Sequence, residues 1–203
     1  MEPKLDLHIN PWDIFTAMWQ LFVTLWPLTL FVIAMIFIGP IFNYLGKITR
    51  RKSHNKKLNK MAKKTYTITQ VDRMKEQGRE FEDFIEMLFR KLGTGTVERT
   101  ERTPVTKDHG CDIIIHFKNG NRLGIQCKQL SSSSSSVGNK AAMEIVHSQK
   151  MYGLTHLMVI TNQKFSEAFK ESARTHRIEM WDRDIVKQKI DDLNNLVNRE
   201  GKG

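Results

Sequence analysis

Residues 111–130 read CDIIIHFKNGNRLGIQCKQL, and this stretch decides the fold. It holds two apolar runs, CDIIIHF and RLGIQCKQL, joined by the polar sequence Lys118-Asn119-Gly120-Asn121. Asn-Gly between two such runs is a strong signal for a tight turn between antiparallel strands. The stretch therefore predicts a β-hairpin.

One face of this hairpin gathers polar groups. Side chains alternate across a strand, so Asp112 on the first strand shares a face with Gln126 and Lys128 on the second. This holds if the isoleucines, Leu123 and both cysteines fill the core on the other face. A carboxylate, an amide and an ammonium on one face suit a divalent cation and a phosphoryl group. An ordinary exposed polar face is the alternative.

The segments around the hairpin alternate between helical and strand patterns. Residues 78–92 have the apolar spacing of a helix, which we expect to begin near Thr69 or Val71 and to end at Gly93. A serine run at 131–136 predicts a flexible loop. Further along, the sequence predicts helix 139–152, strand 155–161, helix 166–176, strand 178–181 and helix 184–198. Short loops between them favour parallel crossovers, which gives an α/β class: a mixed sheet flanked by helices, with the hairpin at one edge.

A membrane anchor is predicted before this domain. No charged side chain occurs from Ile14 to Gly46, a run of 33 residues, whereas a bilayer span needs about 20. We therefore expect one transmembrane helix at 14–46. A buried core helix rarely runs so far without a charge, and a cleaved signal peptide fits less well because the start is net acidic. Pro27 and Gly39-Pro40 leave open a kink or a re-entrant hairpin.

The net charge of +10 is concentrated in one segment. Residues 47–64 hold nine bases and no acid, whereas residues 65–203 carry only +3. This distribution excludes a uniformly basic protein that coats nucleic acid. By the positive-inside rule it predicts a single-pass protein of the cell membrane with its C-terminal part in the cytoplasm, and the basic segment would lie against anionic headgroups. Two cysteines in that compartment are not expected to form a disulfide.

Four short motifs occur in a specific order along the chain. They are Phe81-Glu82, Asp108-His109-Gly110-Cys111-Asp112, Gln126-Cys127-Lys128 and Val137-Gly138-Asn139-Lys140. This order resembles the Mrr-type restriction endonuclease catalytic domain of the PD-(D/E)xK nuclease superfamily, over roughly residues 72–190. The resemblance implies a restriction-endonuclease-like sheet and this organisation: a short N-terminal segment (1–13), the anchor (14–46), a basic juxtamembrane linker (47–68) and an Mrr-like endonuclease domain (69–203).

The resemblance also implies a role for each matching residue. Asp112 would be the metal-binding acid and Lys128 the catalytic lysine, while Gln126 stands where many relatives carry a second acid. The other assignments are the Cys127 backbone carbonyl and Glu82 as metal ligands, Asp108 as an auxiliary acid, and Lys140 and Asn139 as contacts to DNA. The implied cofactor is Mg²⁺, with Mn²⁺ as a substitute. With an amide in place of an acid, we expect weaker cation binding.

These observations predict a membrane-anchored, metal-dependent DNA endonuclease that hydrolyses phosphodiester bonds and restricts foreign or modified DNA. The sequence leaves the oligomeric state open, although cutting both strands with one active site per chain usually requires two chains, as in a homodimer. The first alternative is a non-catalytic DNA-binding or regulatory module on the same fold. The second is a structural membrane protein whose cytoplasmic domain recruits a partner.

Overall fold

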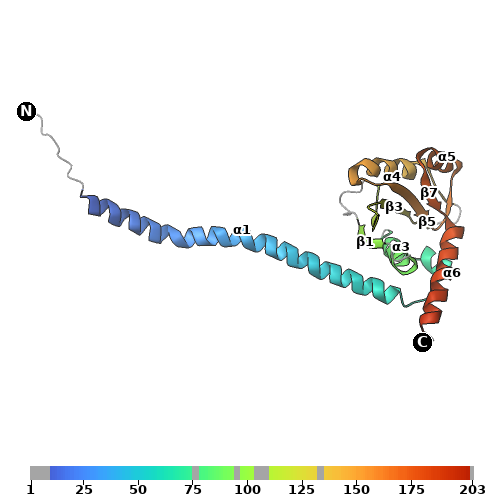
Figure 1. The fold of residues 1–203 in the computed structure, drawn as a ribbon, viewed down its shortest axis with the longest axis horizontal. Helices are drawn as coiled ribbons and strands as arrows, with labels where there is room; N and C mark the ends of the chain where they lie inside the picture. Colours follow the sequence, from blue (N-terminus) through green and yellow to red (C-terminus); the bar gives the residue numbers. More distant parts are fainter. Residues whose placement is uncertain (1–9, 75–77, 94–96, 103–109, 132–134, 202–203) are drawn as a thin grey trace, which may run out of the picture. The chain divides into compact units, whose positions relative to one another are not determined.

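The computed structural model describes residues 10–74, 78–93, 97–102, 110–131 and 135–201. The chain divides into two compact units, Met1–His54 and Asn55–Gly203 (Figure 1). Asp108, one of the predicted site residues, lies outside the described residues.

The first unit contains most of α1 (Pro11–Met61), a helix that is continuous through Pro27 and Pro40. The re-entrant hairpin left open by the sequence is therefore not seen. Large apolar side chains along this helix are exposed, among them Trp19 and Phe31. By length and composition α1 is a candidate for a membrane span, a test that signal sequences near an N-terminus also pass.

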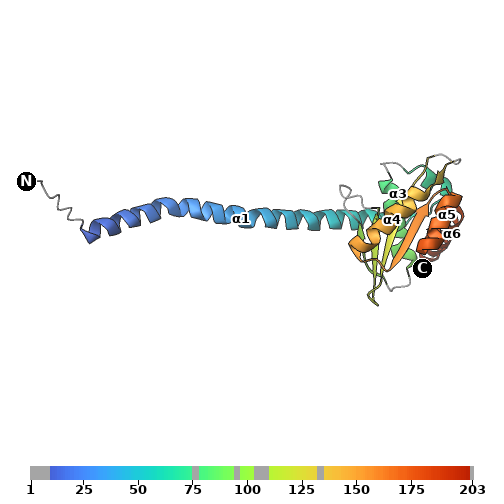
Figure 2. The same ribbon diagram turned by 90° about the horizontal axis from the view of Figure 1, so that it is seen from above.

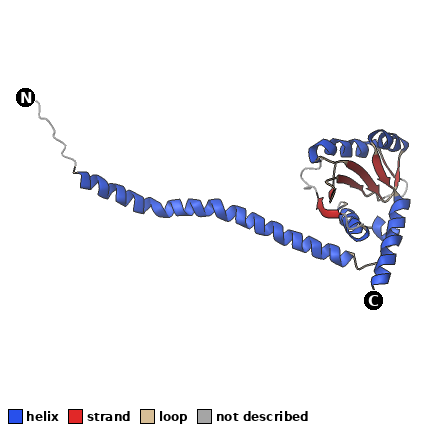
Figure 3. Cartoon of the chain, viewed as in Figure 1, coloured by secondary structure: helices blue, strands red, loops and turns tan. Residues whose placement is uncertain are grey.

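The second unit is built on a five-stranded mixed sheet (Figure 3). Its order is β1-β2-β3-β5-β7, in which β1, β2 and β3 are antiparallel neighbours and β3, β5 and β7 run parallel. The strands are β1 (Val97–Arg102), β2 (Ile113–Phe117), β3 (Arg122–Lys128), β5 (His156–Thr161) and β7 (Ile178–Trp181). A separate parallel pair joins β4 (Ser136–Val137) to β6 (Lys164–Phe165). The predicted mixed sheet and its β2–β3 hairpin are confirmed.

Helices cover both faces of this sheet (Figures 1 and 2). They are α2 (Ile68–Asp72), α3 (Arg79–Leu92), α4 (Asn139–Tyr152), α5 (Glu167–His176) and α6 (Arg183–Glu200). On one face α3 and α6 enclose a core that contains Phe84, Ile125 and Ile190. On the other face α4 and α5 enclose a second core that contains Ile145 and Phe169. The sheet is thus buried on both sides, as expected for parallel crossovers.

The helix expected to start near Thr69 or Val71 is in fact two helices, so this prediction was wrong. A capping box between Thr67 and Gln70 starts α2, which ends at Asp72. The next helix, α3, starts after Gly78, whose φ of 86° is left-handed. A glycine adopts this backbone conformation readily, and the chain direction changes there without steric cost.

The hairpin does not form the edge of the sheet, because β1 pairs with the outer side of β2. The sequence of β1, VERTER, is polar and lacks the apolar alternation from which strands are recognised. Two further strands, β4 and β6, have two residues each, too few to produce a periodic pattern. Strand pairing, rather than local sequence, creates all three.

The expected core face of the hairpin was wrong in one position. Ile113, Ile115 and Ile125 belong to the core under α3, but Cys111 belongs to the core under α4 together with Ile114. Strand β2 begins only at Ile113, so the alternation of side chains does not extend back to Cys111. Both cysteines are free thiols, as predicted.

The last turns of α1 belong to the second unit. Leu58 is 2% exposed and lies in the core with residues of α3 and α6. Lys57 Nζ lies 2.8 Å from Oδ2 of the buried Asp83, and Asn55 accepts a hydrogen bond from Arg90. Part of the segment expected to be a linker is therefore packed into the domain.

An ion pair joins α2 to the start of α6. Both guanidinium nitrogens of Arg183 lie 2.8 Å from the carboxylate oxygens of Asp72, and Asn162 Nδ2 donates to Oδ1 of the same carboxylate at 3.0 Å. Burial acts to raise the pKa of Asp72, but the hydrogen bonds from Arg183 and Asn162 and the charge of Arg183 outweigh it. The pKa of Asp72 is consequently lowered, and the pair fixes α2 beside the carboxyl ends of β3 and β5.

Candidate active site

The hairpin fixes the Asp112 carboxylate against the backbone of β3. Ile113 pairs with Ile125, and the amide of Asp112 donates to the Ile125 carbonyl at 2.9 Å. In return, the Cys127 amide donates to Asp112 Oδ2 at 2.7 Å. This bond holds the carboxylate beside the Gln126-Cys127-Lys128 segment.

Gln126 and Lys128 meet an acid that the sequence analysis missed. Gln126 Nε2 donates to Glu144 Oε2 at 2.7 Å, and Lys128 Nζ lies 2.9 Å from the same oxygen. Glu144 comes from α4, which covers this face of the sheet. The one available signal was the spacing of Glu144 from Lys140, four residues earlier on the same helix, whose Nζ lies 3.8 Å from Glu144 Oε1.

The electrostatics of this cluster favour an ionised Glu144. Burial acts to raise the pKa of Glu144, but the hydrogen bonds from Lys128 and Gln126 and the charges of Lys128 and Lys140 outweigh it. The pKa of Glu144 is therefore below its ordinary value. The carboxylate stays charged at neutral pH, where it accepts hydrogen bonds and donates none.

Gln126 is 1% exposed, and its amide oxygen is a buried acceptor. Gln126 Oε1 has no hydrogen-bond partner among the described residues. An orphaned buried oxygen normally costs stability, and it suits a role as a ligand for a hard cation. The Asp112 carboxylate and the Cys127 backbone carbonyl add further oxygen donors, so this set fits Mg²⁺ or Mn²⁺.

Gly110 brings the chain directly against α4 just before Asp112. Its φ is 78°, and a Cβ placed on it would lie 2.6 Å from backbone atoms of Glu144. Glycine is required here both for the left-handed backbone and for the close approach. Two contacts therefore hold Glu144 against the hairpin. Gly110 packs against its backbone, and Gln126 donates a hydrogen bond to its carboxylate.

A shallow pocket of about 200 Å³ opens beside the cluster. Lys128, Lys140 and Glu144 contribute to its wall, together with Gly138, the residue that precedes α4. Gly138 offers no side chain to cap the amides of the first turn of α4. Two ammonium groups and a helix N-terminus make this pocket suitable for a phosphate group.

The remaining predicted site residues lie in other places. Glu82 is half-buried in the first turn of α3, on the opposite face of the sheet from α4. Asn139 opens α4 and accepts a hydrogen bond from the Ser172 hydroxyl, which links α4 to α5. The side chain of Lys140 is 89% exposed. The structure therefore brings together Gln126, Lys128 and Lys140 through Glu144, while Glu82 belongs to a different layer.

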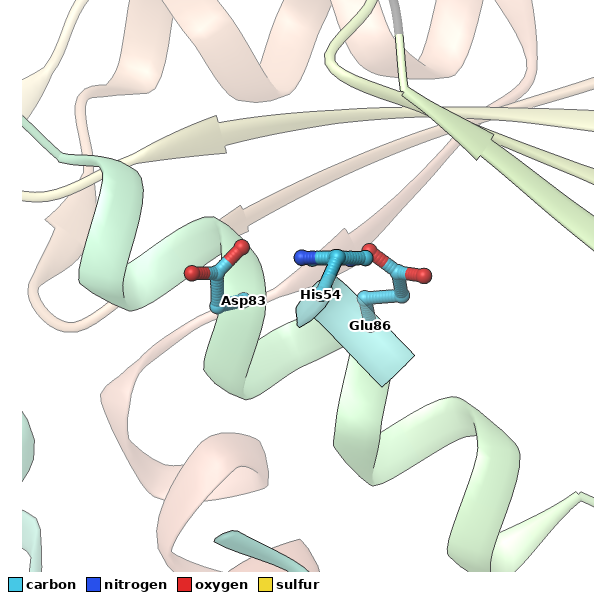
Figure 4. Close-up of side chains that lie close together, drawn as sticks. All are labelled: His54, Asp83 and Glu86. Carbon is cyan, nitrogen blue, oxygen red and sulfur yellow. The ribbon is translucent and has the colours of Figure 1, made fainter. Parts of the chain in front are cut away.

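Two other acids of α3 are more deeply buried than Glu82. Figure 4 shows Asp83 and Glu86 projecting from α3, close to one turn apart. Asp83 is paired with Lys57, and Glu86 Oε1 accepts from Arg90 at 2.7 Å. Each buried carboxylate therefore has a cation beside it, which offsets the cost of burying its charge.

Comparison with known proteins gives one family match. Residues 72–190 match the family model of the Mrr catalytic domain, described as "Restriction endonuclease". No curated protein matches the chain.

Three solved structures are similar to this chain at low identity. The DNA modification-dependent restriction endonuclease AspBHI is 16% identical, with a TM-score of 0.49 over 66% of this chain and 39% of that one. A protein of unknown function, AF1548, is 22% identical, with a TM-score of 0.42 over 50% and 56%. EndoMS in its apo form is 10% identical, with a TM-score of 0.32 over 54% and 47%. The similarity therefore spans 39% to 56% of these other chains.

Proposed function

Because the chain belongs to the Mrr catalytic-domain family of restriction endonucleases, we propose that it is a membrane-anchored DNA endonuclease that depends on a divalent metal. One observation carries this proposal: within the matched residues, the hairpin places Asp112 beside Cys127, and Gln126 and Lys128 converge on one acid. A carboxylate that can hold a divalent cation and a lysine on the same hairpin are groups that can promote hydrolysis of a phosphodiester.

Each residue of the hairpin has a separate task in this proposal. The Asp112 carboxylate, Gln126 Oε1 and the Cys127 carbonyl would hold the cation. When bound, a divalent cation lowers the pKa of water and withdraws charge from a phosphoryl oxygen. Lys128 supplies a positive charge next to the developing charge on the phosphate. Lys140, at the edge of the shallow pocket, binds the DNA backbone, and Asn139 lies beside it.

The proposal keeps two assignments outside the hairpin cluster. Glu82 is an acid of the first helix of the matched region, and we assign it a supporting role as a metal ligand through water. Asp108, as an auxiliary acid, is retained from the motif order alone. Two copies of the chain would act together on the two strands of a duplex.

We propose that α1 anchors the nuclease in the cell membrane, with Asn55–Gly203 in the cytoplasm. The uncharged run from Ile14 to Gly46 supports the span, and the nine bases at 47–64 support the orientation. In this place the enzyme would meet foreign DNA as it enters the cell.

The test uses the full chain in detergent micelles with supercoiled plasmid, either methylated or unmethylated, and Mg²⁺ or Mn²⁺. We expect cleavage by the wild type and its loss in Asp112→Ala and Lys128→Ala. Lys170→Ala is the matched control, because Lys170 is similarly exposed and also pairs with a glutamate, Glu167, at 2.6 Å. Circular dichroism checks that each variant is folded.

Two outcomes would contradict the proposal. Full activity in Lys128→Ala would show that Lys128 of the hairpin takes no part in the reaction. A folded wild type that cleaves nothing, yet binds DNA with an affinity that falls with salt, would indicate the non-catalytic DNA-binding module instead.

A further inference from the structure

The amide of Gln126 presents an orientation problem that a carboxylate would not. A carboxylate offers oxygen at both ends, whereas an amide offers one oxygen and one NH₂ group. Only the oxygen can bind a cation. Gln126 is 1% exposed, so protein neighbours rather than water decide which end points where.

Glu144 decides that orientation. Gln126 Nε2 donates to Glu144 Oε2 at 2.7 Å, and the ionised carboxylate can only accept. Turning the amide over would place two oxygens against each other at hydrogen-bond distance. The nitrogen is therefore held toward α4, and Oε1, which has no partner among the described residues, is directed away from Glu144.

Glu144 also places a negative charge close to the hairpin. The same oxygen, Oε2, lies 2.9 Å from Lys128 Nζ, so one carboxylate contacts both the amide and the lysine. A second acid at position 126 would have carried that charge on the strand. In this chain α4 carries the negative charge, on Glu144, which is one hydrogen bond away from Gln126.

We infer that Glu144 is a positioning residue of the nuclease site, which orients Gln126 so that Oε1 serves as an oxygen ligand for a divalent cation and which holds Lys128 beside it. This inference rests on the proposed function. In this arrangement the Gln126 amide serves as the oxygen ligand that a second acid supplies in many relatives. Glu144 supplies the negative charge that this acid would carry.

The decisive measurement is Mn²⁺ affinity by titration calorimetry on the full chain in micelles. Glu144→Gln keeps the size of the side chain but removes its charge and lets either end of it face Gln126. Loss of a group that orients a metal ligand commonly weakens metal affinity by about 10–100-fold, and we expect a loss in this range. Glu167→Gln is the matched control, since Glu167 also pairs with a lysine on a helix but is 81% exposed, and its affinity should equal that of the wild type.

A swapped variant separates orientation from simple packing. Gln126→Glu alone places two carboxylates together, which should lower stability and raise the pKa of one of them. Combining it with Glu144→Gln restores one amide, one carboxylate and the bond between them. We expect this double variant to recover Mn²⁺ affinity, because a carboxylate at position 126 offers an oxygen to the cation in either orientation.

The outcomes distinguish this inference from the proposed function. Wild-type Mn²⁺ affinity in a folded Glu144→Gln variant would overturn the inference and leave the nuclease proposal standing. A double variant as weak as Glu144→Gln would overturn the orienting role. A wild type that neither binds Mn²⁺ nor cleaves DNA would overturn the proposed function itself.

Discussion

At the scale of single residues, the candidate site depends on a position that has no room for a side chain. Gly110 lies against the backbone of Glu144, where a Cβ would be 2.6 Å away, and it stands two residues before Asp112. Any side chain at this position must displace α4 or the start of β2. Moving α4 separates Glu144 from Gln126, and moving the start of β2 separates Asp112 from the Cys127 amide.

We therefore expect Gly110→Ala to destabilise the domain by about 2–4 kcal/mol, from the left-handed backbone and the steric conflict together. Urea unfolding followed by circular dichroism measures this. Gly120→Ala is the control, since Gly120 has a similar φ of 85° but nothing within 4 Å of its Cβ position. It should cost only the backbone term, about 1–2 kcal/mol. Equal losses in the two variants would show that the contact with Glu144 is unimportant.

The candidate site was predictable from sequence only where its residues lie on one hairpin. The Asn-Gly turn fixes the register, which brings Asp112 to the backbone of β3 and turns Gln126 and Lys128 toward the same side of the strand. Glu144 lies 18 residues beyond Gln126, and its contact depends on how α4 packs over the sheet. No local pattern encodes that packing, so the acid closest to the lysine could not be found from sequence.

At the scale of elements, the ion pair between Asp72 and Arg183 predicts a pH dependence. The pKa of Asp72 is lowered in the folded state, so the unfolded chain binds more protons between the lowered and the ordinary pKa. The stabilisation is therefore complete above the ordinary carboxyl pKa and is lost as the pH falls through the lowered value.

Asp72→Asn should remove this dependence. At neutral pH we expect a loss of about 1–2 kcal/mol, because the pair is partly exposed but bidentate. The gap between wild type and variant should then close as the pH is lowered, in urea unfolding at a series of pH values. Asp192→Asn is the control, because its carboxylate lies 3.4 Å from Lys189 on the surface and should contribute little. If the difference in free energy of unfolding between the wild type and Asp72→Asn stays constant with pH, the lowered pKa of Asp72 is contradicted.

Elements with strong periodicity were predicted well, and the others were not. The bounds predicted for α4, residues 139–152, agree with the structure, because apolar spacing and Gly153 mark its end. The break between α2 and α3 was missed, because the left-handed Gly78 was not recognised as the residue that precedes a new helix. Strand β1 was missed because it reads as a polar segment and exists through its pairing with β2.

At the scale of the whole molecule, the catalytic unit begins earlier than its motifs suggest. Leu58 is buried in the core, and Lys57 contacts the buried Asp83. A fragment of residues 65–203 lacks both, whereas a fragment of residues 55–203 keeps them. We expect the free energy of unfolding of the shorter fragment to be lower by at least the contribution of one core leucine, about 2–5 kcal/mol. A further loss follows because Asp83 no longer has Lys57 beside it.

Thermal unfolding of the two fragments measures this difference. Leu58→Ala in the longer fragment isolates the contribution of the core, and Asn59→Ala, one residue away, serves as its control. If residues 65–203 melt at the same temperature as residues 55–203, the end of α1 is not part of the folded domain.

The proposed anchor predicts where the protein is found in the cell. We expect the full chain to sediment with membranes and to resist extraction at alkaline pH, because an uncharged and largely apolar run of 33 residues does not leave a bilayer without a large cost. Replacing Ile33 and Ile36 by lysine should release it. Recovery of the wild type in the soluble fraction would contradict the anchor.

The contact between Tyr66 and Asn194 sets an order of events during translation. Asn194 accepts from the amide of Tyr66 and donates to its carbonyl, across 128 residues of sequence, and Leu193 completes the core. The fold therefore cannot close until the ribosome has released α6, on the order of 10 s after α1 is made at about 5–20 residues per second. During that interval the core between α3 and α6 is incomplete, so the segment we propose as an anchor can engage the insertion machinery first. If the anchor inserts in that interval, the proposed nuclease site is completed only after the chain is tethered.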